Sequence, residues 1–571
     1  MLKIFPINFL SSIFSEGRIT MMRNGAELVV ESLEAHGVSY IFGIPGAKID
    51  KVFDVLADHG PKLVICRHEQ NAAFMAQAIG RLTGQAGVCL VTSGPGVTNL
   101  VTGLMTANSE GDPVVALGGT VPRSQLLKET HQSLQGVDVM RSVTKYSAEI
   151  DEPSVISEII ANAFRIAEAP LPGAAFVSLP QDVLGADTDV ACFPRLSAPV
   201  LGVAPDVILN EAAAMISKAK CPVLLLGMDA SERSAAEAVR VLLRKHPLPV
   251  VCTYQGGGIV SRDLLECFVG RVGLFVNQPG DVLLREADLI LAIGFQPIEY
   301  DPHLWNANPD AYLINIDSCQ STLEQYYQPK LEILGSISEN LRSLAEKISK
   351  RQYARDIPLV QKLQGALFKG IEQQPTEHEG IVHPLLFIKA LSGAIGDDVV
   401  VTCDVGSHYI WMARYFLRYQ PRKLLFSNGQ QTLGVALPWA IAASLLNPQQ
   451  KIISVSGDGG FLFSAMELET AVRLGSNFVH FVWRDDCYNM VKIQQELKYG
   501  RSFGVALGSP DIVAFAESFG AHGLRINNNN EIDTVMKKAL DLEGPVIVDV
   551  PIDYHDNTSL CINMNVEAYG H

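Results

Sequence analysis

Apolar runs alternate with segments of helical periodicity along most of the chain, and residues 451–489 show this pattern most clearly. Lys451–Ser456 is a short β-branched run that predicts a strand, and Asn477–Trp483 is a second apolar run of the same kind. Between them, apolar residues at helical spacing predict a helix over 465–474, with Gly475 as its stop. A strand, a helix and a strand in this order predict two parallel strands joined by a right-handed crossover.

The same alternation recurs through the rest of the chain. A first helix is expected to begin at Asn24, with Glu27 reaching back to close a capping box. Further strands are expected at residues 38–42, 62–66, 87–92, 112–118, 174–179, 222–226, 249–253, 288–293, 312–317 and 398–403. Strands separated by helices predict parallel sheets that are covered on both faces. We therefore expect an α/β protein with three doubly wound parallel-sheet domains.

Two stretches of different composition separate these domains. Residues 184–203 have the character of a linker, and the stretch that begins at residue 341 is charged and rich in glutamine. The predicted divisions are an extension outside the fold at 1–22, domains at 23–185, 204–340 and 383–555, a linker at 341–382 and a C-terminal tail at 556–571.

Composition and charge narrow the possible partners. A length of 571 residues fits three or four domains, and a net charge of −16 argues against nucleic acid or an acidic membrane surface as a partner. No apolar run approaches the length of a membrane span. The ten cysteines are scattered and form no CxxC pair, which favours buried free thiols in a reducing compartment, and hence a cytoplasmic protein.

Two aspartates follow the two strands of the 451–489 unit. Asp458 lies in the turn Gly457-Asp458-Gly459-Gly460 and Asp485 comes just past the second strand, so both are expected at the same edge of a parallel sheet. Carboxylates beside phosphate oxygens suit Mg²⁺, and glycines let backbone N–H groups approach a phosphate near a helix start. The pair predicts Mg²⁺ held against a diphosphate, whereas the glycine turn alone would be read as an ordinary turn.

The spacing of the two aspartates, 485 − 458 = 27 positions, resembles the signature of thiamine diphosphate (ThDP) enzymes. Longer motifs between about residue 23 and residue 555 resemble the acetolactate synthases, in the group that also holds pyruvate oxidase and acetohydroxyacid synthase: FGIPGAKID, RHEQNAAFMA, TSGPGVTNL, ANSEGDPVVALGG, SNGQQTLGVALPWA and SVSGDGGF. The resemblance implies a pyrimidine-binding first domain, a central Rossmann-like domain and a diphosphate-binding third domain. It also implies a cofactor held between two subunits, so that a homodimer is the smallest active unit, and we expect a homotetramer.

The resemblance implies a catalytic role for Glu69 and a cofactor-binding role for Leu433. Glu69 matches the glutamate that hydrogen-bonds the aminopyrimidine ring, so that the cofactor's own imino nitrogen can remove the thiazolium proton; its alternative reading is a carboxylate at a helix start. Leu433 matches the apolar residue that keeps the cofactor bent, and it could equally be a core leucine.

The remaining predicted contacts come from loops. The metal ligands implied by the resemblance are Asp458, Asp485 and the backbone carbonyl of Cys487, and the cofactor contacts are Gly406, Ser407, His408, Gly457, Gly459, Gly460, Tyr488 and Asn489. Gln132 matches a glutamine that faces the substrates, with a polar loop residue as the alternative. Lys48 could attract a substrate carboxylate or could be a solvated loop charge.

The resemblance implies decarboxylation of one pyruvate and addition to a second, which gives 2-acetolactate. No His-His pair of the kind that pyruvate decarboxylases use occurs in the sequence, which favours addition. The anabolic type has a Trp three positions after its Met-Val pair, whereas Met490-Val491 here lead to Gln494, and Gly270–Asn277 also resembles the catabolic type. We therefore expect ThDP and Mg²⁺, two pyruvates, no FAD, no regulatory subunit and a role in acetoin formation. An FAD-containing anabolic synthase, a pyruvate oxidase and a non-catalytic ThDP-binding paralogue remain as alternatives.

Overall fold

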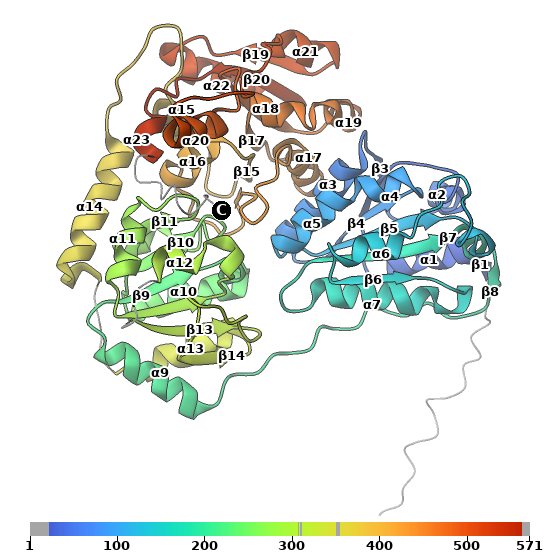
Figure 1. The fold of residues 1–571 in the computed structure, drawn as a ribbon, viewed down its shortest axis with the longest axis horizontal. Helices are drawn as coiled ribbons and strands as arrows, with labels where there is room; N and C mark the ends of the chain where they lie inside the picture. Colours follow the sequence, from blue (N-terminus) through green and yellow to red (C-terminus); the bar gives the residue numbers. More distant parts are fainter. Residues whose placement is uncertain (1–21, 307, 309–310, 350–353, 562–571) are drawn as a thin grey trace, which may run out of the picture.

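The computed structural model of the protein describes residues 22–306, 308, 311–349 and 354–561. It contains three α/β domains, each built on a parallel sheet of six strands (Figure 1). The predicted fold class is therefore confirmed. The predicted N-terminal extension lies outside the described residues except for Met22, and the predicted tail lies outside them beyond Cys561.

The first and third sheets share one strand order. The first sheet runs β3 (Lys62–Ile65), β2 (Tyr40–Gly43), β4 (Gly87–Val91), β5 (Val114–Thr120), β7 (Ala174–Pro180) and β6 (Tyr146–Glu149). The third runs β16 (Leu424–Leu425), β15 (Val401–Cys403), β17 (Ile452–Gly457), β18 (Phe478–Arg484), β20 (Pro545–Pro551) and β19 (His522–Arg525). Counted along the chain, both orders read 2-1-3-4-6-5. The order reverses beside the first strand, and such a switch point is where open α/β sheets bind ligands.

The central sheet has a different order. It runs β11 (Phe268–Val272), β10 (Val250–Thr253), β9 (Pro222–Leu226), β12 (Leu289–Ile293), β13 (Tyr312–Asp317) and β14 (Leu331–Leu334). Counted along the chain, this order is 3-2-1-4-5-6, which is the order of dinucleotide-binding sheets. The predicted Rossmann-like character of this domain is thus seen in its topology, with a switch point between β9 and β12.

Helices cover these sheets. The first domain has α1 (Gly25–Ala35), α2 (Asp50–Asp58), α3 (Glu69–Thr83), α4 (Pro95–Asn99), α5 (Val101–Ser109), α6 (Gly136–Arg141), α7 (Ile156–Glu168) and α8 (Gln181–Leu184). The central domain has α9 (Asp206–Lys218), α10 (Arg233–Lys245), α11 (Pro279–Glu286), α12 (Pro302–Trp305) and α13 (Ile337–Lys347), and α14 (Pro358–Glu372) follows it. The third domain has α15 (Pro384–Ala394), α16 (Ser407–Tyr415), α17 (Ala436–Leu446), α18 (Asp458–Leu462), α19 (Leu468–Leu474), α20 (Asn489–Tyr499), α21 (Ile512–Ser518), α22 (Ile532–Asp541) and α23 (Asn557–Cys561).

Local sequence signals explain several of these boundaries. The capping box predicted at Asn24 is present, because Asn24 and Glu27 each accept the other's backbone N–H. Helix α19 ends at Gly475, which adopts the left-handed conformation that the predicted stop requires. The predicted helix over 465–474 begins as a 3₁₀ turn at Ala465–Glu467, and a separate short helix, α18, starts at Asp458 itself.

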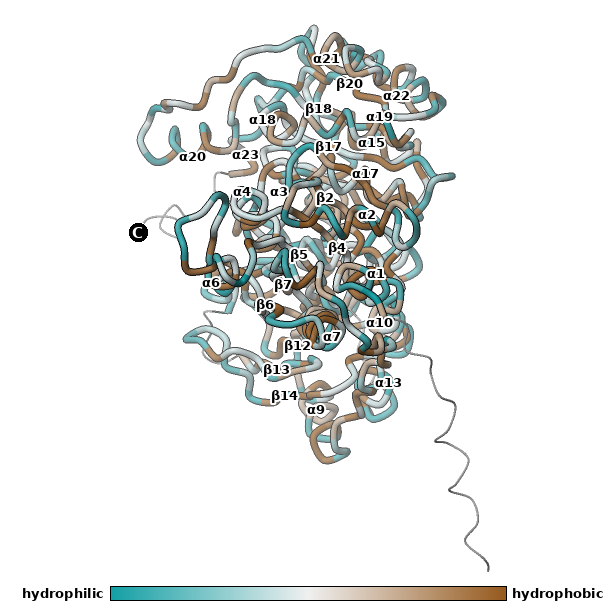
Figure 2. The backbone as a smooth tube through the Cα atoms, turned by 90° about the vertical axis from the view of Figure 1, so that its right-hand side faces the viewer, coloured by the Kyte–Doolittle hydropathy of each residue, from teal (hydrophilic) through white to brown (hydrophobic). Residues whose placement is uncertain are grey.

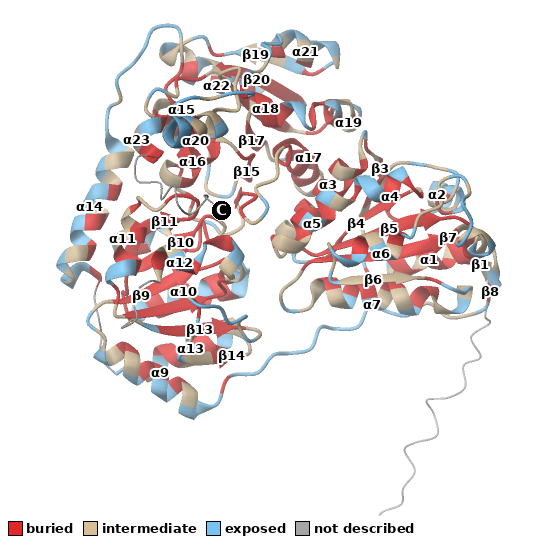
Figure 3. Ribbon diagram, viewed as in Figure 1, coloured by how far each residue is buried: buried red, intermediate tan, exposed pale blue. Residues whose placement is uncertain are grey.

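The first and third domains share a hydrophobic core. Helix α3 packs against α17, and their apolar side chains join one cluster that includes Phe74 from the first domain and Trp439 from the third. The inner strands of each sheet are deeply buried (Figure 3). Apolar segments run through the middle of the molecule, and hydrophilic ones lie mainly along its outline (Figure 2). This core holds the two domains with the same strand order side by side.

The connections between domains differ in character. Residues 189–205 contain no helix or strand and connect the first domain to the central one (Figure 1). The linker was predicted to begin at residue 184, but Asp187–Thr188 form strand β8, which pairs with β1 (Arg23–Asn24). The second predicted linker, 341–382, is largely helical, because α14 lies along α11 and β11 of the central domain. None of the helices in the described part of the chain is long and apolar enough to cross a membrane.

Candidate active site

Three loops meet at the switch point of the third sheet. Residues 404–408 follow β15, residues 457–460 follow β17 and residues 485–489 follow β18. The loops are in direct contact, because the Asp458 Oδ2 atom accepts the Asp486 backbone N–H at 2.6 Å and the Ser407 hydroxyl donates to Asn489 Oδ1 at 2.8 Å. The sequence-predicted residues of these loops are therefore brought together at one edge of one sheet.

Asp458 and Asp485 form a pair of like charges. Asp458 is buried, and burial raises the pKa of its carboxyl group. Burial and the charge of Asp458 raise the pKa of Asp485 to about 7. Two carboxylates in this position repel each other unless a proton or a cation lies between them. The arrangement therefore fits a hard divalent cation such as Mg²⁺, which takes one or two carboxylates and completes its shell with other oxygens.

Such a cation would need oxygen ligands beyond the two carboxylates. Among the described residues, no three His, Cys, Asp or Glu side chains gather into a ready-made metal site. The peptide of Cys487, the predicted third ligand, is fixed on both sides, because Tyr488 N donates to Val505 O at 2.8 Å and Leu507 N donates to Asp486 O at 2.8 Å. The Cys487 carbonyl is thus held rigidly two residues after Asp485.

Asn489 orients one of the two carboxylates. Its amide nitrogen donates to Asp485 Oδ2 at 2.7 Å, and its amide oxygen accepts from the Ser407 hydroxyl and from Asn557 Nδ2, both at 2.8 Å. Trp411 Nε1 in turn donates to Asn557 Oδ1 at 2.6 Å. Asn557 was not predicted from the sequence, because it reaches the site from the last described helix, far along the chain.

Close contacts explain the glycines at positions 459 and 460. A side-chain Cβ at Gly459 would lie 2.6 Å from Cε1 of Tyr488, and one at Gly460 would lie 3.0 Å from the Asp404 carboxylate. A Cβ at Gly457 would lie 3.4 Å from the His408 ring, which also packs against Gly406. Tyr488 therefore packs on the backbone of the glycine turn and supports its position.

His408 carries a polar atom without a partner. It is buried, burial lowers its pKa to about 3, and its Nε2 atom makes no hydrogen bond to any described residue. The nearby His480 is equally buried, but its two ring nitrogens lie 2.7 Å from the hydroxyls of Ser454 and Ser456. A buried neutral imidazole with an unpaired nitrogen at this edge fits a site that takes a polar ligand.

Leu433 lies in a loop that Asp404 fixes. The two carboxylate oxygens of Asp404 each accept the Gly434 backbone N–H at 3.0 Å, and Oδ2 also accepts that of Ala436 at 3.3 Å. Gly434 has a φ of 85°, and a Cβ there would lie 2.6 Å from Phe463 Cβ, so no other residue fits. Leu433 is partly exposed, which separates it from the fully buried leucines of the core. Asp404 is a supporting residue that the sequence did not reveal.

Glu69 is the first residue of α3, at the carboxyl edge of the first sheet. It is almost fully buried, and its Oε2 atom accepts from Asn99 Nδ2 at 2.9 Å. His68 is the N-cap residue, since its Nδ1 atom accepts the Gln70 N–H at 3.1 Å, so Glu69 is not needed as the cap. Glu467 of the third domain accepts the backbone N–H groups of Arg67 at 2.8 Å and His68 at 3.0 Å, which fixes the turn before Glu69.

Gln132 and Lys48 lie at the same edge of the first domain. Gln132 has a φ of 59°, packs its Cβ against Gly94 and accepts from the Ser93 hydroxyl at 3.3 Å. Left-handed backbone at a non-glycine residue costs energy and is common at functional sites. Lys48 follows β2, is partly buried and donates to Gln181 Oε1 at 3.3 Å. The first-domain residues thus form one set on the first sheet, and the aspartate pair belongs to a second set on the third sheet.

The switch point of the central sheet is filled by the chain itself. Glu299 is buried there and accepts from the Thr253 hydroxyl at 2.6 Å and from the backbone N–H groups of Gln296 at 3.0 Å and Met228 at 3.1 Å. A Cβ at Gly227 would lie 2.6 Å from Glu299 Oε1. Burial raises the pKa values of Asp229 and Asp317 at the ends of β9 and β13, and their charges repel each other. The backbone N–H groups of Met228 and Gln296 at this crevice are therefore already bound to Glu299.

Three protein-family models match the chain. The model of the thiamine pyrophosphate enzyme N-terminal TPP binding domain matches residues 23–141, that of the central domain matches 209–344, and that of the C-terminal TPP binding domain matches 404–550. Thiamine pyrophosphate is another name for ThDP. The first and last of these models cover the two sets of residues described above.

Curated relatives match the chain over nearly its whole length. An acetolactate synthase of Bacillus subtilis (strain 168) is 52% identical over 557 residues, which are 97% of this chain and 98% of that protein. A catabolic acetolactate synthase of Raoultella terrigena is 47% identical over 94% of this chain and 96% of that protein. The large subunit of acetolactate synthase isozyme 2 of Escherichia coli (strain K12) is 30% identical over 94% of this chain and 96% of that protein.

The burial of Glu299 predicts a specific pH dependence of stability. Burial raises its pKa from 4.5 to about 8, so the folded protein holds a proton that the unfolded chain releases. The resulting stability is fully present below the normal pKa of a glutamate and is lost as the pH rises through about 8. We expect the free energy of unfolding to fall less steeply between about pH 5 and pH 9 in Glu299→Gln than in the wild type, as measured by urea titration.

A control for this prediction is Glu339→Gln, which changes a half-exposed glutamate at the start of α13. The Glu339→Gln curve should run parallel to that of the wild type. A Glu299→Gln curve that is also parallel would show that Glu299 does not take up a proton on folding.

Proposed function

The chain belongs to the acetolactate synthases of the ThDP-dependent enzyme family, and on this premise we propose that it converts two pyruvates into 2-acetolactate and CO₂ by the catabolic, FAD-independent route. The observation that carries the proposal is the pair of buried Asp458 and partly buried Asp485 at the switch point of the third sheet, in a chain 47% identical to a catabolic acetolactate synthase over nearly its full length. A role in acetoin formation follows from the same similarity.

The third domain is proposed to hold Mg²⁺ and the diphosphate of the cofactor. Asp458, Asp485 and the Cys487 carbonyl would bind the metal, because the repulsion between the two carboxylates favours a cation between them. Asn489 keeps Asp485 in position, and the unpaired Nε2 atom of His408 is available to the cofactor. The proposed diphosphate contacts are Gly406, Ser407, His408, Gly457, Gly459 and Gly460, with Tyr488 supporting the turn.

The first domain is proposed to control a proton. When bound, ThDP supplies the thiazolium carbon that carries the reaction. Glu69 would hydrogen-bond the far ring nitrogen of the aminopyrimidine and so favour the tautomer that can take the thiazolium proton. Its burial strengthens this hydrogen bond, because little water competes for the carboxylate. Leu433 would exclude the extended shape of the cofactor and keep its two rings close together.

Substrate recognition is proposed to involve Lys48 and Gln132. The Lys48 ammonium group can attract the carboxylate of pyruvate. The strained backbone of Gln132 fixes the direction of its side-chain amide at the same edge of the first domain. Gln494 lies on α20, close in sequence to the metal loop, where the anabolic type carries Trp. A smaller polar residue at this position agrees with pyruvate as the second substrate.

Two copies of the chain are proposed to form the smallest active unit, and four the full assembly, without a regulatory subunit. Glu69 and the aspartate pair belong to sets on different sheets, so two chains can each contribute one set. Leu462, Phe463 and Met466 beside the glycine turn are 44%, 47% and 38% exposed, and a second copy would cover them. The ten cysteines are all free thiols, which supports the cytoplasm as the place of action.

The first prediction from this proposal concerns Glu69. In Glu69→Gln, we expect acetolactate formation to fall by about 10²- to 10⁴-fold, because the amide cannot stabilise the required tautomer. The assay is pyruvate with ThDP and Mg²⁺, followed by acid conversion of the product to acetoin. Calorimetry should show that ThDP still binds. Asp50→Asn, at the exposed start of α2, serves as the control. An unchanged rate in Glu69→Gln would remove Glu69 from the mechanism, and an inactive wild type would favour the non-catalytic paralogue.

The second prediction concerns the metal ligands. Asp458→Ala should abolish the uptake heat of ThDP in the presence of Mg²⁺, because one of two carboxylate ligands is lost. Asp486→Asn is a matched control one position beyond Asp485, since Asp486 has a φ of 56°, which asparagine tolerates, and its side chain is half-exposed. Equal losses of ThDP uptake in both variants would show that the loop, rather than the carboxylate, is needed.

The third prediction concerns flavin. Glu299 already accepts the backbone N–H of Met228 at the switch point of the central sheet, in the place where a dinucleotide phosphate would bind. We expect the purified enzyme to show no flavin absorbance and acid extracts to contain no FAD. A flavin bound in stoichiometric amount would contradict this part of the proposal and favour an anabolic synthase or a pyruvate oxidase.

A further inference from the structure

The loop that carries Leu433 has little structure of its own. Residues 426–435 connect β16 to α17 and contain no helix or strand. Gln431 has a φ of 50°, so the backbone is strained at a non-glycine residue just before Leu433. A strained conformation persists only where its surroundings impose it, so the contacts of this loop must hold Leu433 in place.

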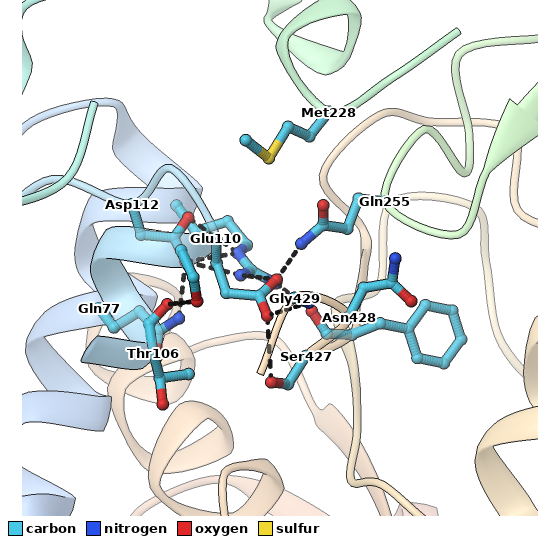
Figure 4. A network of polar contacts seen from close by, with 12 residues as sticks. Gln77, Thr106, Glu110, Asp112, Met228, Gln255, Ser427, Asn428 and Gly429 are labelled. Atoms are coloured by element: carbon cyan, nitrogen blue, oxygen red, sulfur yellow. Dashed lines mark hydrogen bonds and ion pairs between the residues drawn. The ribbon is translucent and has the colours of Figure 1, made fainter. Parts of the chain in front are cut away.

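Glu110 of the first domain is the centre of those contacts (Figure 4). It is only 3% exposed, at the end of α5, and its Oε1 atom accepts the Gly429 backbone N–H at 2.8 Å and the Ser427 hydroxyl at 3.2 Å. Its Oε2 atom accepts from Gln255 of the central domain and lies 3.4 Å from Arg81 Nη2. One carboxylate of the first domain thus binds the start of the loop and a side chain of the central domain.

Further hydrogen bonds connect Glu110 to the residue before Leu433. The Ser427 hydroxyl also accepts the Thr432 backbone N–H at 3.2 Å, and the Thr432 hydroxyl lies 2.8 Å from that of Thr106, one turn before Glu110 on α5. Asn428 donates to the Glu299 carbonyl of the central domain and accepts from Tyr409 of the third. The residue directly before Leu433 is therefore tied to the helix end that bears Glu110.

The charge of Glu110 is balanced inside the first domain. Arg81 contacts both Glu110 and Asp112, the latter at 2.6 Å, and its guanidinium group lies over the Trp439 ring. Burial raises the pKa of Glu110, and the Arg81 charge opposes this shift. Buried ion pairs contribute little net stability, whereas the loss of one partner is costly. A carboxylate in this place is better explained by the geometry that it fixes than by the stability that it adds.

We propose that Glu110 is a positioning residue for the reaction, which holds the 426–435 loop so that Leu433 keeps the cofactor bent. The proposal rests on the role of Leu433 in the proposed function. Glutamine at position 110 would keep the size of the side chain but would replace one acceptor oxygen by an amide donor that faces other donors. The loop would then lose its anchor on the side before Leu433, while Asp404 still binds Gly434 after it. Leu433 would therefore shift although it is not itself changed.

The experiment compares Glu110→Gln with Asp112→Asn. Asp112 is also buried, and it accepts from Arg81 and from Gln77 Nε2 at 2.8 Å, but none of its hydrogen bonds involves residues 426–435. Arg81 itself donates to the Phe426 carbonyl of the loop at 2.6 Å. Each variant leaves Arg81 with one carboxylate to hold it there, so the two variants differ in whether the loop loses a direct contact with the changed side chain. Ser427→Ala, which removes one loop donor, is a milder second variant in case Glu110→Gln does not fold.

Two readouts are needed. Hydrogen–deuterium exchange with mass spectrometry reports on peptide 426–435 before cofactor is added, and NMR of acid-quenched samples gives the exchange rate of the thiazolium proton of bound ThDP. We expect faster amide exchange in the loop of Glu110→Gln and a thiazolium exchange slower by about 10- to 100-fold, because small misplacements near reacting groups have effects of this order. Ser427→Ala should show the same changes to a smaller extent, and Asp112→Asn should show neither.

Leu433→Ala distinguishes a failure of the role of Glu110 from a failure of the role of Leu433. A slow thiazolium exchange in Leu433→Ala, with Glu110→Gln and Asp112→Asn alike in both readouts, would overturn the role of Glu110 and leave the proposed function intact. An unchanged thiazolium exchange in Leu433→Ala would overturn the role of Leu433, and the Glu110 proposal with it.

Discussion

The repulsion between two carboxylates at one edge of the third sheet is the constraint on which the site depends. The parallel arrangement of β17 and β18 places Asp458 and Asp485 beside each other, and burial prevents water from screening their charges. Every neighbouring feature relieves or directs this repulsion. The Asp486 N–H and Asn489 amide bind the two carboxylates, and glycines leave room for a cation and its anionic partner. The same pair in water would have no such preference for a metal.

The strand order of each sheet is related to the residues that lie at its edge. The first and third have the same strand order, and the proposed functional residues lie at the carboxyl edge of each. The central sheet has the order of a dinucleotide-binding domain, yet Glu299 accepts the backbone N–H groups that a phosphate would otherwise accept. Glu299, with Asp229 and Asp317 nearby, thus lies in the crevice where sheets of this order bind a dinucleotide. The proposal that no second cofactor binds therefore rests on these side chains and not on the fold.

Much of the fold could be predicted from the sequence, because long buried strands have a strong apolar pattern. Residues 222–226 and 312–317 form strands with the predicted bounds. The edge strands β6 and β19 were missed, since their residues are only partly buried and the pattern is weak there. Strand β11, which contains Gly270, was not predicted, and β20, although fully patterned, was not recognised beside the tail.

The site residues that lie in short local motifs could be predicted from the sequence. Those that contact residues far away in the chain could not. The turn at Gly457–Gly460 and the 485–489 loop can be read from short segments. Asp404 acts on Gly434, and Glu467 on His68, over separations that no local pattern reports. Asn557 reaches Asn489 from the end of the described chain.

These distant residues share one physical role. Asp404, Glu467 and Glu110 are buried carboxylates, and each accepts backbone N–H groups of a turn next to a proposed functional residue. A carboxylate accepts several hydrogen bonds at once, so one side chain can fix a turn that has no regular structure. Burial makes each of these bonds stronger and makes the loss of any one of them more costly. The loop of Leu433 is thus tied to Asp404 of its own domain and to Glu110 of the first domain, and the turn before Glu69 is tied to Glu467 of the third.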